Sequence, residues 1–231
     1  MARDLAFAVV GVAVGSFLTV VIHRLPAKRS VVSGRSMCPS CGTVIRARDN
    51  VPVLSWLLLR GRCRTCGARI SILYPLTELA TAGLFAGAAL QFDRTLVAAT
   101  MAGFFAMLLA ASAIDARHRI IPNRLVLPSA AILAAMVIAA DATGGGVSAG
   151  DAALGLLAYS GGLLLISLIS PRGMGMGDVK IAAVIGFVLG SLGLRCVAVA
   201  AGAAVLGGGV AAIGALLAGR SRKDEIGRAH V

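Results

Sequence analysis

Charged residues are scarce in this chain, and acidic residues are the scarcest. Only 14% of the 231 residues are charged, against about 25% in an average soluble domain, while 58% are hydrophobic. This shortage excludes an ordinary soluble globular domain and indicates an integral membrane protein. Long apolar runs recur along the chain. They favour transmembrane helices over a β-barrel, whose strands are short and alternate in polarity.

Aromatic residues are also few, at 4%, whereas glycine is abundant, with 29 residues. Small side chains let helices approach closely in lipid, and Gly11 and Gly15 have a spacing that suits such a contact. We therefore predict an all-α polytopic membrane protein. About seven transmembrane helices are expected, near residues 5–22, 72–92, 95–114, 125–140, 152–169, 179–194 and 196–218. The first run lacks a convincing cleavage site and is interpreted as a retained span, not a signal peptide.

The shortage of acids leaves a formal net charge of +12. In a soluble protein this excess would suggest nucleic-acid binding. Here basic loops on the cytoplasmic side explain it better, and no nucleic-acid partner is expected. All of the 22 lysines and arginines except Arg3, Arg94 and Arg195 fall in residues 24–71, 116–124 and 172–180 and in the tail after Gly219. This distribution predicts an N-terminus on the outer side and a cytoplasmic loop at 24–71.

The chain divides into a first span at residues 1–23, a polar region at 24–71, a membrane core at 72–219 and a basic tail at 220–231. Residues 225–231 continue no pattern, and the same heptapeptide arises when a common sequencing adapter is translated. We expect residues 225–231 to be an artefact of sequence assembly. The authentic chain is then expected to continue into a further apolar span.

Four cysteines in the polar region have the spacing of a metal site. Cys38 and Cys41 form one C-x2-C pair, Cys63 and Cys66 form a second, and 21 residues separate the pairs. This is close to zinc-ribbon spacing, and four thiolates can bind zinc tetrahedrally. The alternative is two disulfides, which the reducing cytoplasm disfavours. Between the pairs, Trp56 and residues 57–59 either pack under the ribbon or lie on the membrane surface.

Two aspartates interrupt the apolar part of the chain. Asp115 closes one apolar run, and Asp178 ends the Gly-rich stretch 173–178. Ionisable groups at membrane depth are costly, so each is a candidate functional residue. The chain crosses the membrane twice between them, which predicts that both lie at the cytoplasmic face. The plainer interpretations are a hinge for the Gly-rich stretch, a helix N-cap for Asp178, and a salt bridge from Asp115 to Arg117 or Arg119.

Two neighbouring carboxyls can act as an aspartyl dyad, because they share one proton when both cannot ionise together. One would activate water while the other polarises a peptide carbonyl. If Asp115 closes its helix and Asp178 opens its own, the helix dipoles make Asp178 the base and Asp115 the acid. Glu78, a third acid in an apolar run, is interpreted as a buried structural residue paired with an arginine of the basic loop. A direct chemical role is the alternative.

Several segments together resemble the bacterial type IV prepilin peptidase family, a group of GxGD intramembrane aspartyl proteases. The resemblance covers the chain to about residue 220. It is carried by the GxGD motif with Gly175, Gly177, Asp178 and Lys180, by Asp115 with Ile121, Pro122 and Asn123, by the segments 15–18 and 21–26, by both C-x2-C pairs, and by Tyr74 to Leu79 with Glu78.

The resemblance implies catalysis by Asp115 and Asp178, with leader peptides of type IV prepilins and type II secretion pseudopilins as substrates. It also implies location in the bacterial inner membrane, with the active site at the cytoplasmic face. Many family members methylate the new N-terminus with S-adenosylmethionine, and the Cys-bearing region is associated with that step. Two alternatives stay open: a peptidase without methyltransferase activity, and a non-enzymatic membrane scaffold. The residues that would bind S-adenosylmethionine and the oligomeric state are not predicted.

Overall fold

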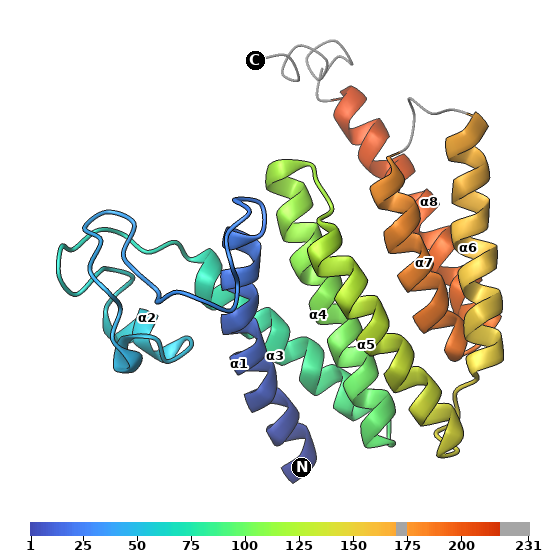
Figure 1. The fold of residues 1–231 in the computed structure, drawn as a ribbon, viewed down its shortest axis with the longest axis horizontal. Helices are drawn as coiled ribbons and strands as arrows, with labels where there is room; N and C mark the ends of the chain where they lie inside the picture. Colours follow the sequence, from blue (N-terminus) through green and yellow to red (C-terminus); the bar gives the residue numbers. More distant parts are fainter. Residues whose placement is uncertain (170–174, 218–231) are drawn as a thin grey trace.

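The computed structural model of the chain describes residues 1–169 and 175–217, and in these ranges it forms helices without β-strands (Figure 1). The long helices are α1 (Ala2–Arg24), α3 (Leu73–Gln91), α4 (Thr95–His118), α5 (Asn123–Ala142), α6 (Ala149–Ile169), α7 (Met176–Ser191) and α8 (Leu194–Leu217). Five of them, α1 and α3 to α6, are long and apolar enough to cross a membrane. The predicted all-α polytopic fold is confirmed.

The helices form a bundle in which α1 and α3 lie on one side, α4 and α5 in the middle, and α6, α7 and α8 on the other side (Figure 1). Successive long helices run in opposite directions. The C-terminal ends of α1, α4 and α6 therefore lie at the same end of the bundle as the start of α7. The polar region between α1 and α3, which contains η1 (Ala47–Asp49) and α2 (Leu54–Leu58), extends to the side of this bundle.

Helix α4 is the buried centre of the bundle. Phe104 and Met101 are each 1% exposed and Ile114 is fully buried. A helix that is apolar on all sides can be surrounded by protein or by lipid, and α4 is surrounded by protein, since it packs against α1, α3 and α5. Because α4 is enclosed in this way, its last turn, which carries Asp115, has a fixed position.

Glycines set the distances between two helix pairs. A Cβ added at Gly11 of α1 would lie 2.8 Å from the Cα of Ala82 in α3, and one at Gly15 would lie 2.7 Å from the Cα of Glu78. This confirms the predicted helix contact. A second close contact joins α6 and α7, where a Cβ at Gly155 would overlap the carbonyl oxygen of Gly186. In lipid, such backbone-to-backbone packing replaces the hydrophobic effect as the main source of helix association.

Helix ends differ from the prediction in two places near the aspartates. The third span was expected to end near Ile114, with Asp115 closing its helix. This is wrong, because α4 continues through His118 and the Arg119 amide donates a hydrogen bond to the Asp115 carbonyl. Helix α7 begins at Met176, three residues before the expected Val179. The predictions for residues 173, 174 and 220–231 concern positions outside the described ranges.

Candidate active site and cysteine cluster

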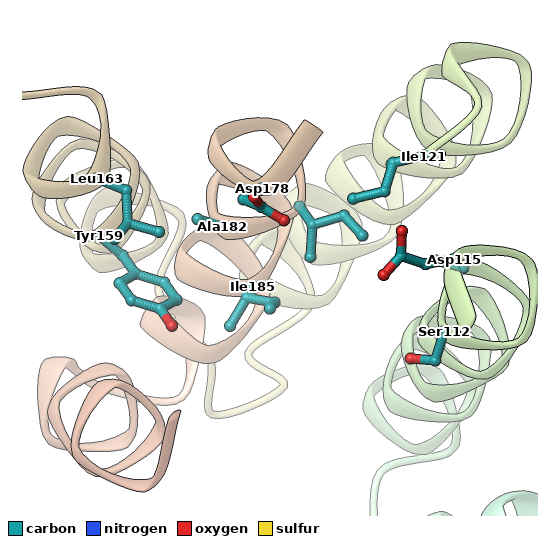
Figure 2. Close-up of a pocket in the computed structure, with 10 residues that line it drawn as sticks. Ser112, Asp115, Ile121, Tyr159, Leu163, Asp178, Ala182 and Ile185 are labelled. Carbon is teal, nitrogen blue, oxygen red and sulfur yellow. The ribbon is translucent and has the colours of Figure 1, made fainter. Parts of the chain in front are cut away.

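Asp115 and Asp178, which are far apart in the sequence, line the same cavity. The cavity has a volume of about 240 Å³ and lies between the last turn of α4 and the start of α7, with α6 on its far side. Both carboxylate groups point into the space between α4 and α7 (Figure 2). Both side chains are exposed at the protein surface. Two carboxyls in one cavity are the elements that acid–base catalysis of hydrolysis requires.

Asp178 is held by the start of α7. Gly175 is the N-cap residue of this helix, so the interpretation of Asp178 as a plain N-cap is wrong. The Asp178 amide donates to the Gly175 carbonyl at 3.1 Å, which tightens the first turn. A Cβ added at Gly175 would lie 3.5 Å from Asp178 Oδ2. The glycine therefore leaves the carboxylate open to the cavity on that side.

The segment that follows Asp115 packs directly on the segment that carries Asp178. A Cβ added at Gly177 would lie 3.1 Å from Cδ1 of Ile121. One turn further along α7, Lys180 Nζ donates to Asn123 Oδ1 at 2.9 Å. These two contacts connect the α4–α5 loop to α7. They explain how two motifs that are separate in the sequence bring both aspartates to one cavity.

Neither aspartate is neutralised within the described part of the chain. The ion pairs there join Asp4 to the N-terminus and Arg3, and Asp49 to Arg64. The alternative of a salt bridge from Asp115 to Arg117 or Arg119 is therefore not what the structure forms. The assignment of Asp115 as the acid and Asp178 as the base assumed that Asp115 closes its helix. That premise fails, because α4 continues for three residues beyond Asp115. Asp178 does lie in the first turn of α7, as expected.

Two further polar side chains line the cavity, and the sequence did not single them out. Ser112 lies one turn before Asp115 on α4, and Tyr159 reaches the cavity from α6 (Figure 2). The spacing of Ser112 and Asp115 puts both on one helix face, which was a usable signal. Tyr159 is one of only two tyrosines in the chain, but a lone tyrosine in an apolar run does not indicate which neighbour it faces.

Glu78 is buried, as predicted, but its partner is not an arginine. The side chain is 6% exposed, and Oε2 accepts a hydrogen bond of 2.7 Å from the backbone amide of Val53. Val53 has a φ of 58°, an uncommon backbone conformation for a β-branched residue. Glu78 thus connects α3 to the start of α2, and it does not line the cavity between the aspartates.

The four cysteines of the polar region converge, as their spacing predicted. Their sulfur atoms all lie within 4.8 Å of one another, and the Sγ atoms of Cys38 and Cys66 are 3.8 Å apart. Tetrahedral zinc with Zn–S bonds of about 2.3 Å requires sulfurs roughly 3.8 Å apart, so the cluster fits this ion. All four are free thiols, in disagreement with the disulfide alternative.

Each cysteine pair sits on a tight turn of the same design. The amides of Gly42 and Gly67 donate to the carbonyls of Cys38 and Cys63 at 2.9 Å. These glycines have φ values of 69° and 70°, in the left-handed region where a side chain is disfavoured. An isolated antiparallel bridge closes each turn, Met37 with Val44 and Arg62 with Arg69. Two such turns facing each other bring the four thiols together.

Hydrogen bonds already favour the thiolate form at part of the cluster. Hydrogen bonds with the side chain of Thr43 and, to a smaller extent, with its backbone lower the pKa of Cys41 to about 6. Backbone amides of Cys66 and Thr65 lower the pKa of Cys63. The Ala68 amide lowers the pKa of Cys66, but proton sharing with the neighbouring thiols outweighs it and raises that pKa to about 11. Metal binding requires deprotonated thiols, so this environment suits a cation.

Trp56 packs inside the polar region. Its Nε1 donates to the Ile70 carbonyl at 3.1 Å, and its ring contacts Gly61. Leu57 and Leu58, in contrast, are 58% and 73% exposed. The two alternatives for this segment therefore apply to different residues, with the tryptophan packed inside and the leucines outside.

Comparisons with known proteins agree over most of the chain. Residues 9–92 match the bacterial peptidase A24 N-terminal domain, and residues 102–213 match the type IV leader peptidase family. The chain is 35% identical over 215 residues to a prepilin leader peptidase/N-methyltransferase of Bacillus subtilis, covering 93% of this chain and 84% of the relative.

Proteins with the same name from Burkholderia pseudomallei and Neisseria gonorrhoeae are also similar. The first is 38% identical over 238 residues, covering 87% of this chain and 75% of the relative. The second is 37% identical over 214 residues, covering 79% of this chain and 73% of the relative. No solved structure matches the chain.

Proposed function

Because the chain belongs to the type IV leader peptidase family, we propose that it is a membrane-embedded aspartyl endopeptidase with Asp115 and Asp178 as its catalytic pair. It removes the leader peptides of type IV prepilins and type II secretion pseudopilins, and it methylates the new N-terminus with S-adenosylmethionine. The observation that carries the proposal is that two acids from distant segments line one cavity.

The chemistry follows from two carboxyls that hold one proton between them. The ionised carboxylate takes a proton from water, and the resulting hydroxide attacks the carbonyl carbon of the scissile peptide bond. The protonated carboxyl keeps its proton and donates a hydrogen bond to the carbonyl oxygen, which stabilises the negative charge of the tetrahedral intermediate. A proton then passes to the leaving nitrogen as the C–N bond breaks, so the pair returns to its starting protonation. Either aspartate can begin as the base.

The substrate carries a basic leader, and few acids are available to bind it. Glu78 is occupied by the Val53 amide. Asp49 is held by Arg64, whose guanidinium donates to both carboxylate oxygens and lowers the pKa of Asp49. Asp115 and Asp178 are then the acids at this end of the described chain that are left to attract the leader. Anionic lipid headgroups supply the remaining negative charge.

The four-cysteine cluster is proposed to bind one structural zinc ion. Cys38, Cys41, Cys63 and Cys66 would hold it, and the fit of their sulfur spacing supports this assignment. Closed four-sulfur sites supply folding free energy and leave no open position for catalysis. The zinc therefore stabilises a region with little core of its own, and it takes no part in peptide hydrolysis.

The site is proposed to lie at the cytoplasmic face of the bacterial inner membrane. The basic residues supporting this placement cluster in the region between α1 and α3 and around the α4–α5 loop, at Arg117, Arg119 and Arg124. Positive loops remain in the cytoplasm during membrane insertion. The end of α4 and the start of α7, which carry the aspartates, lie at the same end of the bundle as the α4–α5 loop (Figure 1).

Single substitutions of the aspartates test the proposal. Asp115→Asn and Asp178→Asn keep the side-chain size and remove the ionisable group, so each should abolish leader cleavage of a purified prepilin. The double variant should be no worse than either single one, because the pair works as a unit. Asp93→Asn, at an exposed aspartate between α3 and α4, is the matched control and should cleave normally. Cleavage by either single variant would reject the aspartyl mechanism and favour a membrane scaffold.

A further inference from the structure

The short helix α2 carries an exposed apolar face that its own region does not cover. Leu54, Leu57 and Leu58 are 52%, 58% and 73% exposed. Their spacing of three and four residues puts them on one side of the helix. Trp56 and Ser55 point the other way, since Trp56 bonds to Ile70 and Ser55 is buried. The helix thus has its three leucines outside, while Trp56 and Ser55 pack inward.

A buried hydrogen bond fixes the depth of this face relative to the membrane helices. Val53, the residue before α2, donates to Glu78, which is the sixth residue of α3. At about 1.5 Å per residue, Glu78 lies roughly 8 Å along α3 from its start. Figure 1 shows the result, with α2 lateral to α1 and α3 and level with the body of α1, not beyond their ends.

The neighbouring face of α3 is apolar and exposed at the same level. Leu76 and Leu79 flank Glu78 in sequence and are 50% and 53% exposed. Since α3 has the length and hydropathy of a membrane span, lipid is the natural environment of these residues. The Val53–Glu78 hydrogen bond thus places the exposed leucines of α2 beside a helix whose own exposed leucines suit lipid.

Exposed arginines border the leucines of α2 on both sides in the sequence. The nearest are Arg46 and Arg48 before the helix, and Arg60 and Arg62 after it. Asp49, the one acid in this segment, is neutralised by Arg64. Within the described ranges none of these four arginines forms an ion pair. Leucines beside such arginines are typical of a helix that lies in the interface of an anionic bilayer.

We propose that α2 is an interfacial membrane anchor. Leu54, Leu57 and Leu58 enter the headgroup and upper acyl region of the leaflet that α3 enters, and the flanking arginines bind the phosphates of anionic lipids. Glu78 is the tether that holds α2 at this depth. The four-cysteine cluster consequently rests on the membrane surface at a fixed orientation. A protein partner at this position would have to displace lipid already in contact with α3.

Tryptophan fluorescence can test the anchor, because Trp56 is the only tryptophan in the chain. The full-length protein would be reconstituted in vesicles of phosphatidylcholine and phosphatidylglycerol with brominated acyl chains, which quench nearby tryptophan. Leu58→Trp should add emission that is blue-shifted and strongly quenched. Val32→Trp is the matched control, since Val32 is 91% exposed in the same polar region but outside α2. Its added emission should be red-shifted and unquenched.

The tether is tested in the Leu58→Trp background. Glu78→Leu removes the acceptor for the Val53 amide, so the quenching of Trp at position 58 should fall toward that of the control. Glu78→Gln keeps a carbonyl acceptor and should retain the quenching. Unchanged zinc content in each variant shows that the cysteine region is still folded.

Three results would overturn the proposal. The first is equal, weak quenching for Leu58→Trp and Val32→Trp. The second is a blue shift of the Leu58→Trp emission that is seen in detergent without lipid and increases with protein concentration. That result would mean that a second copy of the chain covers this face. The third is quenching that survives Glu78→Leu, which would remove the tether role. The readout is independent of peptidase activity.

Discussion

At the scale of single residues, the hydrogen bond from Lys180 to Asn123 connects the two segments that carry the aspartates. We expect Lys180→Met to lower kcat/KM for leader cleavage about fivefold, because a hydrogen bond from a charged group at a partly exposed site contributes about 1 kcal/mol. Asn123→Ala should have a similar effect, measured on a purified prepilin in detergent.

The two substitutions should not add, because they remove the same interaction. Arg124→Met is the control, since it deletes an exposed cation next to Asn123. If the double variant loses the product of the two single effects, or if Arg124→Met is equally damaging, the contact between Lys180 and Asn123 does not position the site.

Sequence analysis identified the residues whose chemistry conflicts with an apolar environment. Asp115 and Asp178 were visible because acids are rare in this chain, and the cysteines because two C-x2-C pairs seldom occur by chance. Tyr159 and Ser112 were missed because neutral polar side chains are common in membrane helices. The Val53 partner of Glu78 was also hidden, because no side chain signals a free backbone amide.

At the scale of helices, the contact between α6 and α7 depends on a glycine that has no room for a side chain. A methyl group at Gly155 would overlap the Gly186 carbonyl and approach Gly190, so the two helices must separate. We expect Gly155→Ala to destabilise the protein by about 1–3 kcal/mol. It should also reduce cleavage, because α6 carries Tyr159 and α7 carries Asp178.

Gly161→Ala provides the matched control within α6, since nothing lies within 4 Å of a Cβ at that position. It should be neutral or slightly stabilising, because alanine favours the helix. Thermal unfolding in detergent measures both variants. Similar unfolding temperatures for Gly155→Ala and Gly161→Ala would contradict the close packing of α6 on α7.

The cysteine region gives a second prediction at this scale. Cys66→Ser should reduce the zinc content from about one ion per chain to near zero, because a three-thiolate site binds zinc far more weakly. The long helices should stay inserted, since α1 and α3 to α6 are each long and apolar enough to cross a membrane. Metal analysis of the purified protein measures the content, and Cys196→Ser, in α8, should leave it unchanged. Wild-type protein without bound metal would reject the zinc assignment.

The helix boundaries show why the fold was easier to predict than its details. Apolar runs predicted each long helix, because hydropathy reports which segments lie within the membrane, whether lipid or other helices surround them. The end of α4 was misplaced because Arg117 and His118 are polar but still helical, extending one turn beyond the apolar segment. Hydropathy therefore locates the membrane boundary, and it does not locate the hydrogen bond that ends a helix. Asp115 lies at the membrane boundary, and the helix ends one turn later.

At the scale of the whole molecule, the path of the chain decides whether the aspartates can meet. Helices α5 and α6 carry the chain away from Asp115 and back to Asp178, so the two share a face only if both helices cross the membrane. The α5–α6 loop must then lie on the outer side. Gly150 is exposed near this loop, and a Cβ there contacts only the Ser148 hydroxyl at 3.7 Å, so Gly150→Cys is tolerated.

We expect a membrane-impermeant maleimide to label Gly150→Cys in intact spheroplasts, in a Cys196→Ser background that removes the cysteine of α8. Ala116→Cys, exposed beside Asp115, should be labelled only after the membrane is opened. The reverse pattern would place the aspartates on the outer face, where the basic leader of a cytoplasmic precursor is not present during cleavage. Labelling of both positions from the same side would mean that α5 and α6 do not both cross the membrane, and the shared cavity would lose its topological basis.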